Sequence, residues 1–258
     1  MALRAILFDK DGTFVDFQAT WSPATHAVMR RMAAGDADKF AALAAHNHYD
    51  PETGKLAPTS PLVAGSSADY GQAWAAILGV APSTAFLSHM DTLFAEEALA
   101  HLAPIGEPAR LFEGLKRDGY ALGIVTNDSE IGARSQCDRL GLTPWLDAII
   151  GYDSGHGRKP EAGQIRAFGR RHGYRPSEMA LVGDTLHDLH AARAAGVTAI
   201  AVLTGFADAT VLAPHADHVL PDLMALPALL ASKRAMLRHE VGQHTVTVGY
   251  PADGRGEG

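Results

Sequence analysis

The chain has 258 residues, of which 47% are hydrophobic and 20% are charged, so its composition is that of a globular protein rather than a disordered one. Its net charge of -7 argues against a nucleic-acid partner bound through a basic surface. A single cysteine, Cys137, excludes an intramolecular disulfide, and we expect it to fill a hydrophobic core rather than to act as a nucleophile.

No segment approaches the roughly 20 apolar residues that are needed to span a bilayer. Asp9 and Asp11 interrupt the short apolar segment near the amino terminus, so we expect no signal peptide there. One cysteine is consistent with a reducing compartment. These observations predict a cytoplasmic protein with no membrane partner.

The first predicted strand runs from Leu3 to Phe8 and is followed by two carboxylates, Asp9 and Asp11. Side chains alternate along a strand, so a continued strand would direct these carboxylates to one side and Lys10 to the other. Taken alone, the segment is explained equally well by a site that holds a cation or handles protons and by a solvated acidic turn.

Residues 17–102 are rich in alanine and lack a convincing strand. Apolar side chains recur there at steps of three and four residues, as on one face of a helix. Helices are expected over residues 69–78, 82–93 and 94–102, and a turn over residues 50–54. The segment therefore has the pattern of a helical insertion after the first strand.

From Pro104 onward, a helix, a glycine and a short apolar strand recur four times, which is typical of a parallel sheet with helices on both faces. The strands are expected over residues 121–126, 148–150, 180–184 and 198–202, and the helices before them over 109–115, 131–140, 160–173 and 186–195. A strand over 218–220 and a helix over 223–231 complete the pattern, and residues 246–248 could add an edge strand.

In such folds ligands bind beyond the carboxyl ends of the strands. The polar residues at these ends, or at the start of a predicted helix, are Asp9, Asp11, Thr126, Asn127, Lys159, Asp184 and Asp188. Oxygen ligands without sulfur suit Mg²⁺, whereas a helix start and a lysine suit a phosphate. An aspartate that can attack completes the requirements for phosphoryl transfer through an aspartyl phosphate.

Four motifs resemble those of the haloacid dehalogenase (HAD) superfamily, in its phosphoglycolate-phosphatase-like branch. They are Asp9-Lys10-Asp11-Gly12-Thr13, Thr126-Asn127, Lys159-Pro160, and Gly183-Asp184 through Asp188. The resemblance implies an α/β fold with a Rossmann-like doubly wound parallel sheet core and an inserted helical cap domain. It divides the chain into a core of residues 1–16 and 103–232, a cap of residues 17–102, and a C-terminal tail of residues 233–258.

The resemblance also implies a role for each acidic residue. Asp9 would be the nucleophile, and Asp11 would be the general acid and base. The Asp9 carboxylate, the Asp11 backbone carbonyl and Asp184 would hold Mg²⁺, with Asp188 in support.

Three further residues would hold the phosphoryl group and offset its charge, namely Thr126, Asn127 and Lys159. This family often has an apolar residue after the nucleophile, where the present chain has Lys10. Because side chains alternate along a strand, we expect Lys10 to face away from the chemistry.

The resemblance predicts a Mg²⁺-dependent phosphatase that acts on a small phosphorylated metabolite, with phosphoglycolate as the default substrate. Two alternatives remain at this point, a sugar phosphomutase of the same superfamily and a catalytically silent phosphate-binding protein. The oligomeric state is open between a monomer and a homodimer. Cap side chains should set the specificity, and Trp21 and Trp74 could either line the substrate pocket or pack in a core.

Overall fold

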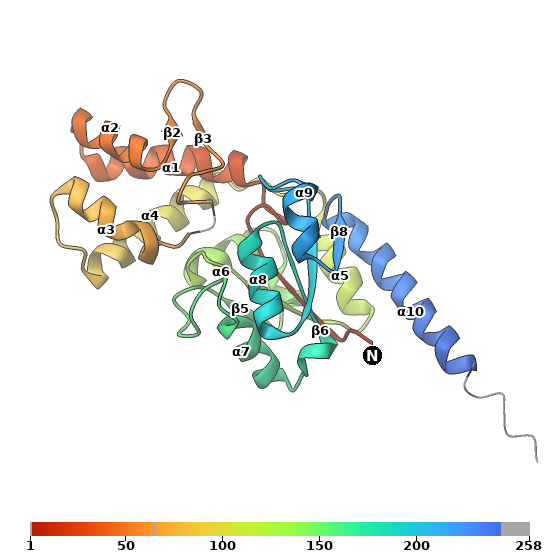
Figure 1. Cartoon of the computed structure of the whole chain (residues 1–258). Helices are drawn as coiled ribbons and strands as arrows, with labels where there is room; N and C mark the ends of the chain where they lie inside the picture. The colour runs from red at the N-terminus through yellow and green to blue at the C-terminus, as the bar shows by residue number, and fades with distance from the viewer. Residues whose placement is uncertain (1, 64, 244–258) are drawn as a thin grey trace, which may run out of the picture.

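The computed structural model of the protein describes residues 2–63 and 65–243 (Figure 1). A parallel sheet with helices on both faces forms one part of the molecule, and a group of helices forms the other. None of the described helices is both long enough and apolar enough to cross a lipid bilayer.

The central sheet has six parallel strands in the order β5-β4-β1-β6-β7-β8. The strands are β1 (Ala5–Phe8), β4 (Ala121–Val125), β5 (Ala148–Ile150), β6 (Met179–Gly183), β7 (Thr198–Val202) and β8 (His218–Leu220). Phe8, the last residue of β1, pairs with Ile124 of β4 and Val182 of β6. The residues after these three strands therefore lie side by side at one edge of the sheet.

Helices cover both faces of the sheet, as the sequence predicts. The first face carries α5 (Pro108–Arg117), α6 (Glu130–Arg139) and α10 (Leu226–Gln243), and the second carries α7 (Gly163–His172) and α8 (Leu186–Ala195). Successive β1 side chains pack on opposite faces of the sheet. Ile6 and Phe8 pack in the first core, and Ala5 and Leu7 pack in the second. Cys137 lies fully buried in the first core, which confirms its assignment as core filler.

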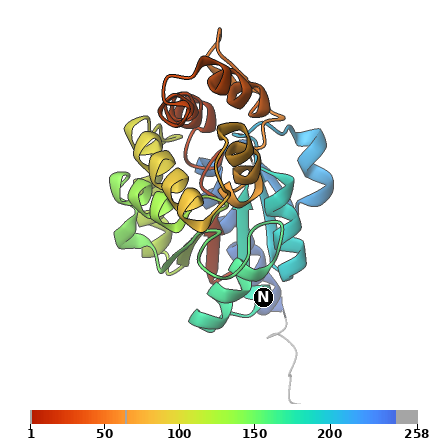
Figure 2. The same cartoon turned by 90° about the vertical axis from the view of Figure 1, so that its left-hand side faces the viewer.

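The remaining helices pack on one another around a separate apolar core (Figures 1 and 2). They are α1 (Phe17–Ala33), α2 (Ala37–His46), α3 (Ser67–Leu78) and α4 (Thr84–Ala100), and we call them the helical segment. Two expectations fail here. The helices predicted over 82–93 and 94–102 are the single helix α4, because no glycine or proline interrupts residues 84–100. A two-stranded hairpin, β2 (Tyr49–Asp50) and β3 (Lys55–Leu56), forms where no strand was expected, and the turn that was expected there joins its strands.

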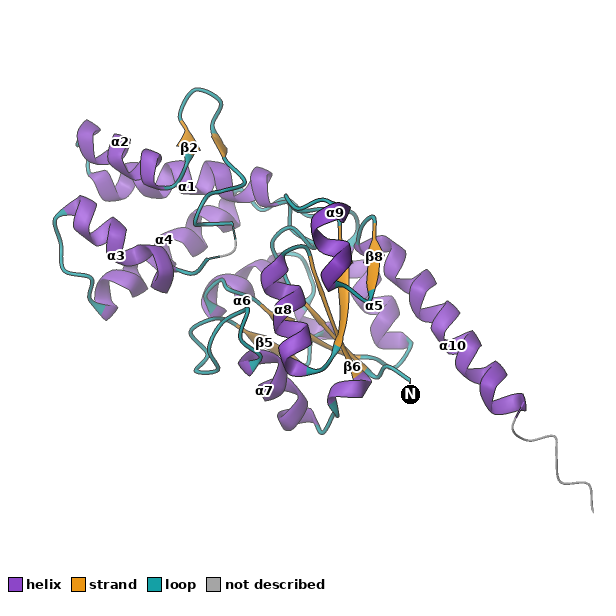
Figure 3. Ribbon diagram, viewed as in Figure 1, coloured by secondary structure: helices purple, strands orange, loops and turns teal. Residues whose placement is uncertain are grey.

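Two helices of the sheet part, α7 and α10, also differ from their predicted bounds. Figure 3 shows α10 as one long helix. Helix α7 begins at Gly163 instead of residue 160. The helix expected over residues 223–231 consists of a 3₁₀ turn, Leu223–Ala225, followed by α10. No proline or glycine occurs over residues 228–241, so nothing in that stretch stops the helix. The strand expected over residues 246–248 lies outside the described residues.

Candidate active site

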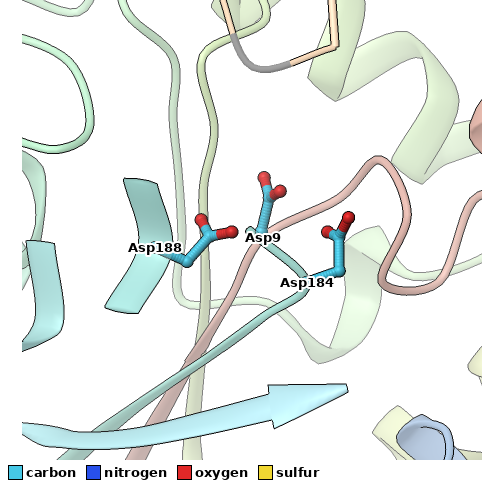
Figure 4. Close-up of side chains that lie close together, drawn as sticks. All are labelled: Asp9, Asp184 and Asp188. Carbon is cyan, nitrogen blue, oxygen red and sulfur yellow. The ribbon is translucent and has the colours of Figure 1, made fainter. Parts of the chain in front are cut away.

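Three aspartates meet at the carboxyl edge of the sheet, where their side chains lie close together (Figure 4). Asp9 follows β1, Asp184 follows β6, and Asp188 lies in the first turn of α8. Each offers a carboxylate oxygen, and these three oxygens lie within 4.8 Å of one another. The parallel pairing of β1 and β6 explains why Asp9 and Asp184 lie close together. The Asp9 N–H donates to the Val182 carbonyl, and this hydrogen bond fixes the end of β1 beside β6.

Asp188 is held by the start of α8. Its Oδ2 accepts hydrogen bonds from the Thr185 backbone N–H at 3.0 Å and from the Thr185 hydroxyl at 2.6 Å. Thr185 in turn caps the helix, which makes the pair a capping box. The other oxygen, Oδ1, accepts from Lys159 Nζ at 2.7 Å. Asp188 therefore belongs both to the helix cap and to the charged cluster.

Asp184 fits where it does because two glycines leave room for it. A Cβ atom on Gly12 would lie 2.2 Å from Asp184 Oδ2, and one on Gly205 would lie 1.8 Å from the same atom. Gly12 also has a φ of +78°, which favours glycine. The hydroxyl of Thr204 donates to the Gly12 carbonyl at 2.5 Å, so the turn after β1 is tied to the loop after β7.

Thr204 and Gly205 were missed by the sequence-based reasoning. They follow β7, whose carboxyl end was not considered with the other strand ends although β7 was correctly predicted. A survey of every predicted strand end for polar residues and glycines would have found both of them.

Lys159 is the cation of the cluster. Its Nζ lies 2.6 Å from Asp9 Oδ1 and 2.7 Å from Asp188 Oδ1. Burial disfavours the charged form of Lys159, but the charges of Asp188 and Asp9 outweigh burial and raise its pKa, so it stays protonated. The carboxamide of Asn127 accepts from the Lys159 N–H and donates to the Lys159 carbonyl, both at 2.9 Å. The Asn127 side chain thus positions Lys159.

Thr126 lies directly after β4, beside Asp9, and is almost completely buried. Its hydroxyl accepts from the Asp128 N–H at 3.1 Å, and its carbonyl accepts from Gln164 Nε2 at 2.9 Å. Ser129 then caps the start of α6. Thr126 and the α6 start line the same pocket as Asp9 and Lys159, and the backbone N–H groups of Ser129 and Gly132 are already bonded to the side chains of Asp128 and Ser129.

The acidic triad of Asp9, Asp184 and Asp188 carries more negative charge than Lys159 can offset. Burial raises the pKa of Asp9 to about 7; Lys159 opposes this shift, whereas Asp188 and Asp11 add to it. Burial, with the charges of Asp9 and Asp188, also raises the pKa of Asp184 well above its usual value. Buried carboxylate oxygens that repel one another and lack a full counter-charge fit a hard divalent cation such as Mg²⁺.

Lys10 does not face away from the site, and this prediction was wrong. Its fully buried Nζ lies 2.7 and 2.6 Å from the two carboxylate oxygens of Asp11. It also donates to Gln136 Oε1 at 2.8 Å and lies 3.3 Å from Asp128 Oδ2. Strand β1 ends at Phe8, so the alternation of side chains does not extend to residue 10.

Lys10 is the buried counter-charge for two partly buried acids, Asp11 and Asp128. Burial opposes its charge, but Asp11 and Asp128 outweigh burial and raise the Lys10 pKa. Burial raises the pKa of Asp128 to about 6, although Lys10 opposes this shift. The Asp11 carboxylate is thereby held outside the acidic triad, next to the helical segment.

The two tryptophans have different surroundings. Trp21 of α1 lines the pocket, and its Nε1 donates to Asp11 Oδ1 at 2.6 Å. Trp74 of α3 lies in the core of the helical segment, where its Nε1 donates to Asn47 Oδ1 at 3.0 Å. Trp21 therefore connects the helical segment directly to an acid of the site.

Further polar contacts bring the helical segment against the sheet part. The Tyr152 hydroxyl donates to Asp91 Oδ2 of α4 at 2.6 Å and lies 2.8 Å from Ser67 Oγ of α3. Arg158 Nη2 pairs with Asp69 Oδ1 at 2.5 Å. The pocket lies between the two parts, with the helical segment opposite Asp9 and Lys159.

Comparisons with known proteins agree with this geometry. The family model "Haloacid dehalogenase-like hydrolase" matches residues 6–202. A phosphoglycolate phosphatase of Agrobacterium fabrum is 34% identical over 121 residues, which are 47% of this chain and 52% of that protein. The chain thus spans about half the length of such curated relatives. A match to the phosphoglycolate phosphatase of Rhodospirillum rubrum, at 27% identity, covers 86% of this chain and 89% of that protein.

Solved structures share the fold. A predicted phosphoglycolate phosphatase from Haemophilus somnus matches with a TM-score of 0.65 and 18% identity, over 88% of this chain and 97% of that one. A hydrolase from Pseudomonas syringae matches with a TM-score of 0.63 and 19% identity, over the same shares of the two chains. At these identities the likeness concerns the fold alone.

Proposed function

Because the chain belongs to the haloacid dehalogenase-like hydrolase family, we propose that it is a Mg²⁺-dependent phosphatase that acts on a small phosphorylated metabolite. The observation that carries the proposal is the acidic triad with Lys159 held 2.6 Å from Asp9. Relatives are named phosphoglycolate phosphatase, which makes phosphoglycolate the first substrate to test.

In the proposed reaction, an Asp9 carboxylate oxygen attacks the phosphorus atom of the ester. The bond from phosphorus to the alcohol oxygen breaks, and an Asp11 carboxyl group that carries a proton gives it to the departing oxygen. Asp11 then takes a proton from water, which attacks the phosphorus atom of the aspartyl phosphate. Inorganic phosphate leaves, and Asp9 is regenerated with its carboxylate intact.

The other residues support these two steps. Lys159 and the Thr126 hydroxyl would hold the phosphoryl oxygens and offset their charge. The side chains of Asp9 and Asp184 and the backbone carbonyl of Asp11 would hold Mg²⁺, which when bound offsets the negative charge of nucleophile and phosphate. Asp188 would keep Lys159 in place through its 2.7 Å contact.

The proposal is tested by release of inorganic phosphate from p-nitrophenyl phosphate and from phosphoglycolate. We expect turnover with Mg²⁺, its loss in a chelator, and recovery when Mg²⁺ is added back. Asp9→Asn should lower kcat on the order of a thousandfold or more, because it removes the attacking group. Asp38→Asn, at an exposed position of α2, is the matched control.

Equal rates in wild type and Asp9→Asn would refute the proposal. Net release of phosphate also separates it from a sugar phosphomutase, which isomerises its substrate without losing phosphate. Binding of a phosphate analogue without turnover of any ester would instead favour a silent binding protein.

A further inference from the structure

The wall of the pocket that faces Asp9 is aromatic. The helical segment contributes Phe17 and Trp21 from α1, Tyr70 from α3 and Phe94 from α4. Their rings contact one another, with centroids 6.4 Å apart for Phe17 and Trp21, 5.9 Å for Trp21 and Phe94, and 6.3 Å for Tyr70 and Phe94. Leu62 and Val63 extend this wall with aliphatic side chains. We call these six residues the apolar wall.

The charge on this side of the pocket is negative. Among the described residues of the helical segment and its loops that line the pocket, the one charged side chain is Asp91. It accepts hydrogen bonds from the hydroxyls of Ser67 and Tyr152, which hold it at the pocket. Burial raises the Asp91 pKa, and the hydrogen bonds from Ser67 and Tyr152 oppose this shift.

The basic side chains of the pocket lie on the opposite side and are already engaged. Lys159 contacts Asp9 and Asp188, and His187, in the first turn of α8, also lines the pocket. Arg158 lies outside the lining of this pocket and is paired with Asp69. No lysine or arginine of the helical segment, within the described residues, lines the pocket to receive a second anionic group.

This lining disfavours the binding of a substrate whose alcohol part carries a carboxylate. When the phosphate is placed at Asp9 and Lys159, the rest of the molecule must meet the apolar wall and Asp91. A carboxylate buried there loses its hydration without gaining a cation, and it lies near a like charge. An apolar group gains from burial against the rings, and an ammonium group gains from ring faces and a nearby acid.

We infer that the substrate is a phosphomonoester whose alcohol part carries no negative charge and presents an apolar or ammonium group to the apolar wall. The inference rests on the proposed phosphatase function and names its substrate class. It makes phosphoglycolate, whose alcohol part is a carboxylate, a poor substrate for this chain.

The test compares three esters with Mg²⁺: benzyl phosphate, choline phosphate and phosphoglycolate. We expect the better of the first two to exceed phosphoglycolate in kcat/KM by at least about tenfold, the factor that one uncompensated charge contact of ordinary strength produces. The same esters are compared as competitive inhibitors of p-nitrophenyl phosphate hydrolysis, so that their order is measured even where turnover is slow. A smaller ratio, or the reverse order, overturns the inference.

Two lysine variants test the apolar wall itself. Val63→Lys places a cation at a half-buried position of the wall, and it should shift the kcat/KM ratio toward phosphoglycolate by about fivefold or more. Val80→Lys makes the same chemical change at an exposed position outside the pocket and should leave the ratio unchanged. Equal ratios in the two variants would contradict the inference.

The outcomes separate the inference from the function on which it rests. Absence of phosphate release from all three esters and from p-nitrophenyl phosphate would refute the phosphatase function, and the inference with it. Turnover of p-nitrophenyl phosphate together with a preference for phosphoglycolate would leave the phosphatase function standing and overturn the inference alone.

Discussion

Replacing Lys10 by methionine removes the buried counter-charge of Asp11 and Asp128 while keeping a side chain of similar length. At an effective dielectric constant of about 20, the contacts of 2.6 and 3.3 Å correspond to roughly 6 and 5 kcal/mol of attraction. Loss of Lys10 also removes its own desolvation penalty of several kcal/mol, which leaves a net loss of stability of about 3–5 kcal/mol.

The assay is denaturant unfolding of wild type and Lys10→Met at neutral pH. Lys116→Met is the matched control, because Lys116 Nζ lies equally close to Asp147, at 2.6 Å, but both side chains are about a third exposed. The control should lose about 0–1 kcal/mol. Adding Asp128→Asn to Lys10→Met should recover part of the lost stability, because it removes one of the two negative charges that Lys10 no longer offsets. Equal losses in the two lysine variants would refute the reasoning.

Three further substitutions test other parts of the account. Gly205→Ala would place a Cβ 1.8 Å from Asp184 Oδ2, so we expect it to lower kcat by about a hundredfold in a phosphate-release assay. Tyr152→Phe removes the hydroxyl that contacts Asp91 and Ser67 across the pocket and should lower kcat/KM by roughly three- to tenfold with little change in Tm. Hydrogen bonds from Arg175 lower the Glu178 pKa from 4.5 to about 2, so this carboxylate stabilises the fold above pH 4.5 and that stabilisation is lost as the pH falls toward 2. Glu178→Gln should therefore be less stable than wild type near pH 7, and the difference should vanish near pH 2.

Each of these predictions has an outcome that would contradict it. Gly114→Ala, on α5 with open space around its Cβ, is the control for Gly205→Ala, and equal activity in both would show that the space at Asp184 is unimportant. An unchanged kcat/KM in Tyr152→Phe would show that the contact with Asp91 does not matter for turnover. A stability difference for Glu178→Gln that does not depend on pH would contradict the assignment to its ionised form.

The sheet could be predicted from the sequence because the apolar runs that mark single strands agree with the order of helices and strands that marks a parallel sheet. The strands β4 to β7 are short apolar runs, a glycine follows the helix before each of them, and polar residues follow strands β1, β4 and β6, as at Asp9, Thr126 and Asp184. In a parallel sheet those ends share one edge whatever the details of packing. The meeting of Asp9, Asp184 and Asp188 therefore agrees with what the pattern implied.

The parts that could not be predicted depend on contacts between distant segments. The orientation of Lys10 is set by Gln136 and Asp128, which lie more than 110 positions away, after the alternation of β1 has ended. The Asn127 carboxamide binds the backbone of Lys159, a pairing that no local pattern encodes. The spacing of apolar residues along the sequence also gave no sign that Trp21, rather than Trp74, reaches the pocket.

The central claim is that Asp9 carries the phosphoryl group. Its most direct test is to quench the enzyme during turnover of p-nitrophenyl phosphate with Mg²⁺ and to reduce it with borohydride, which converts an aspartyl phosphate to homoserine. The account predicts homoserine at position 9 in the peptide mass spectrum, and none when substrate is left out. Homoserine at another aspartate, or steady turnover by Asp9→Asn, would contradict it.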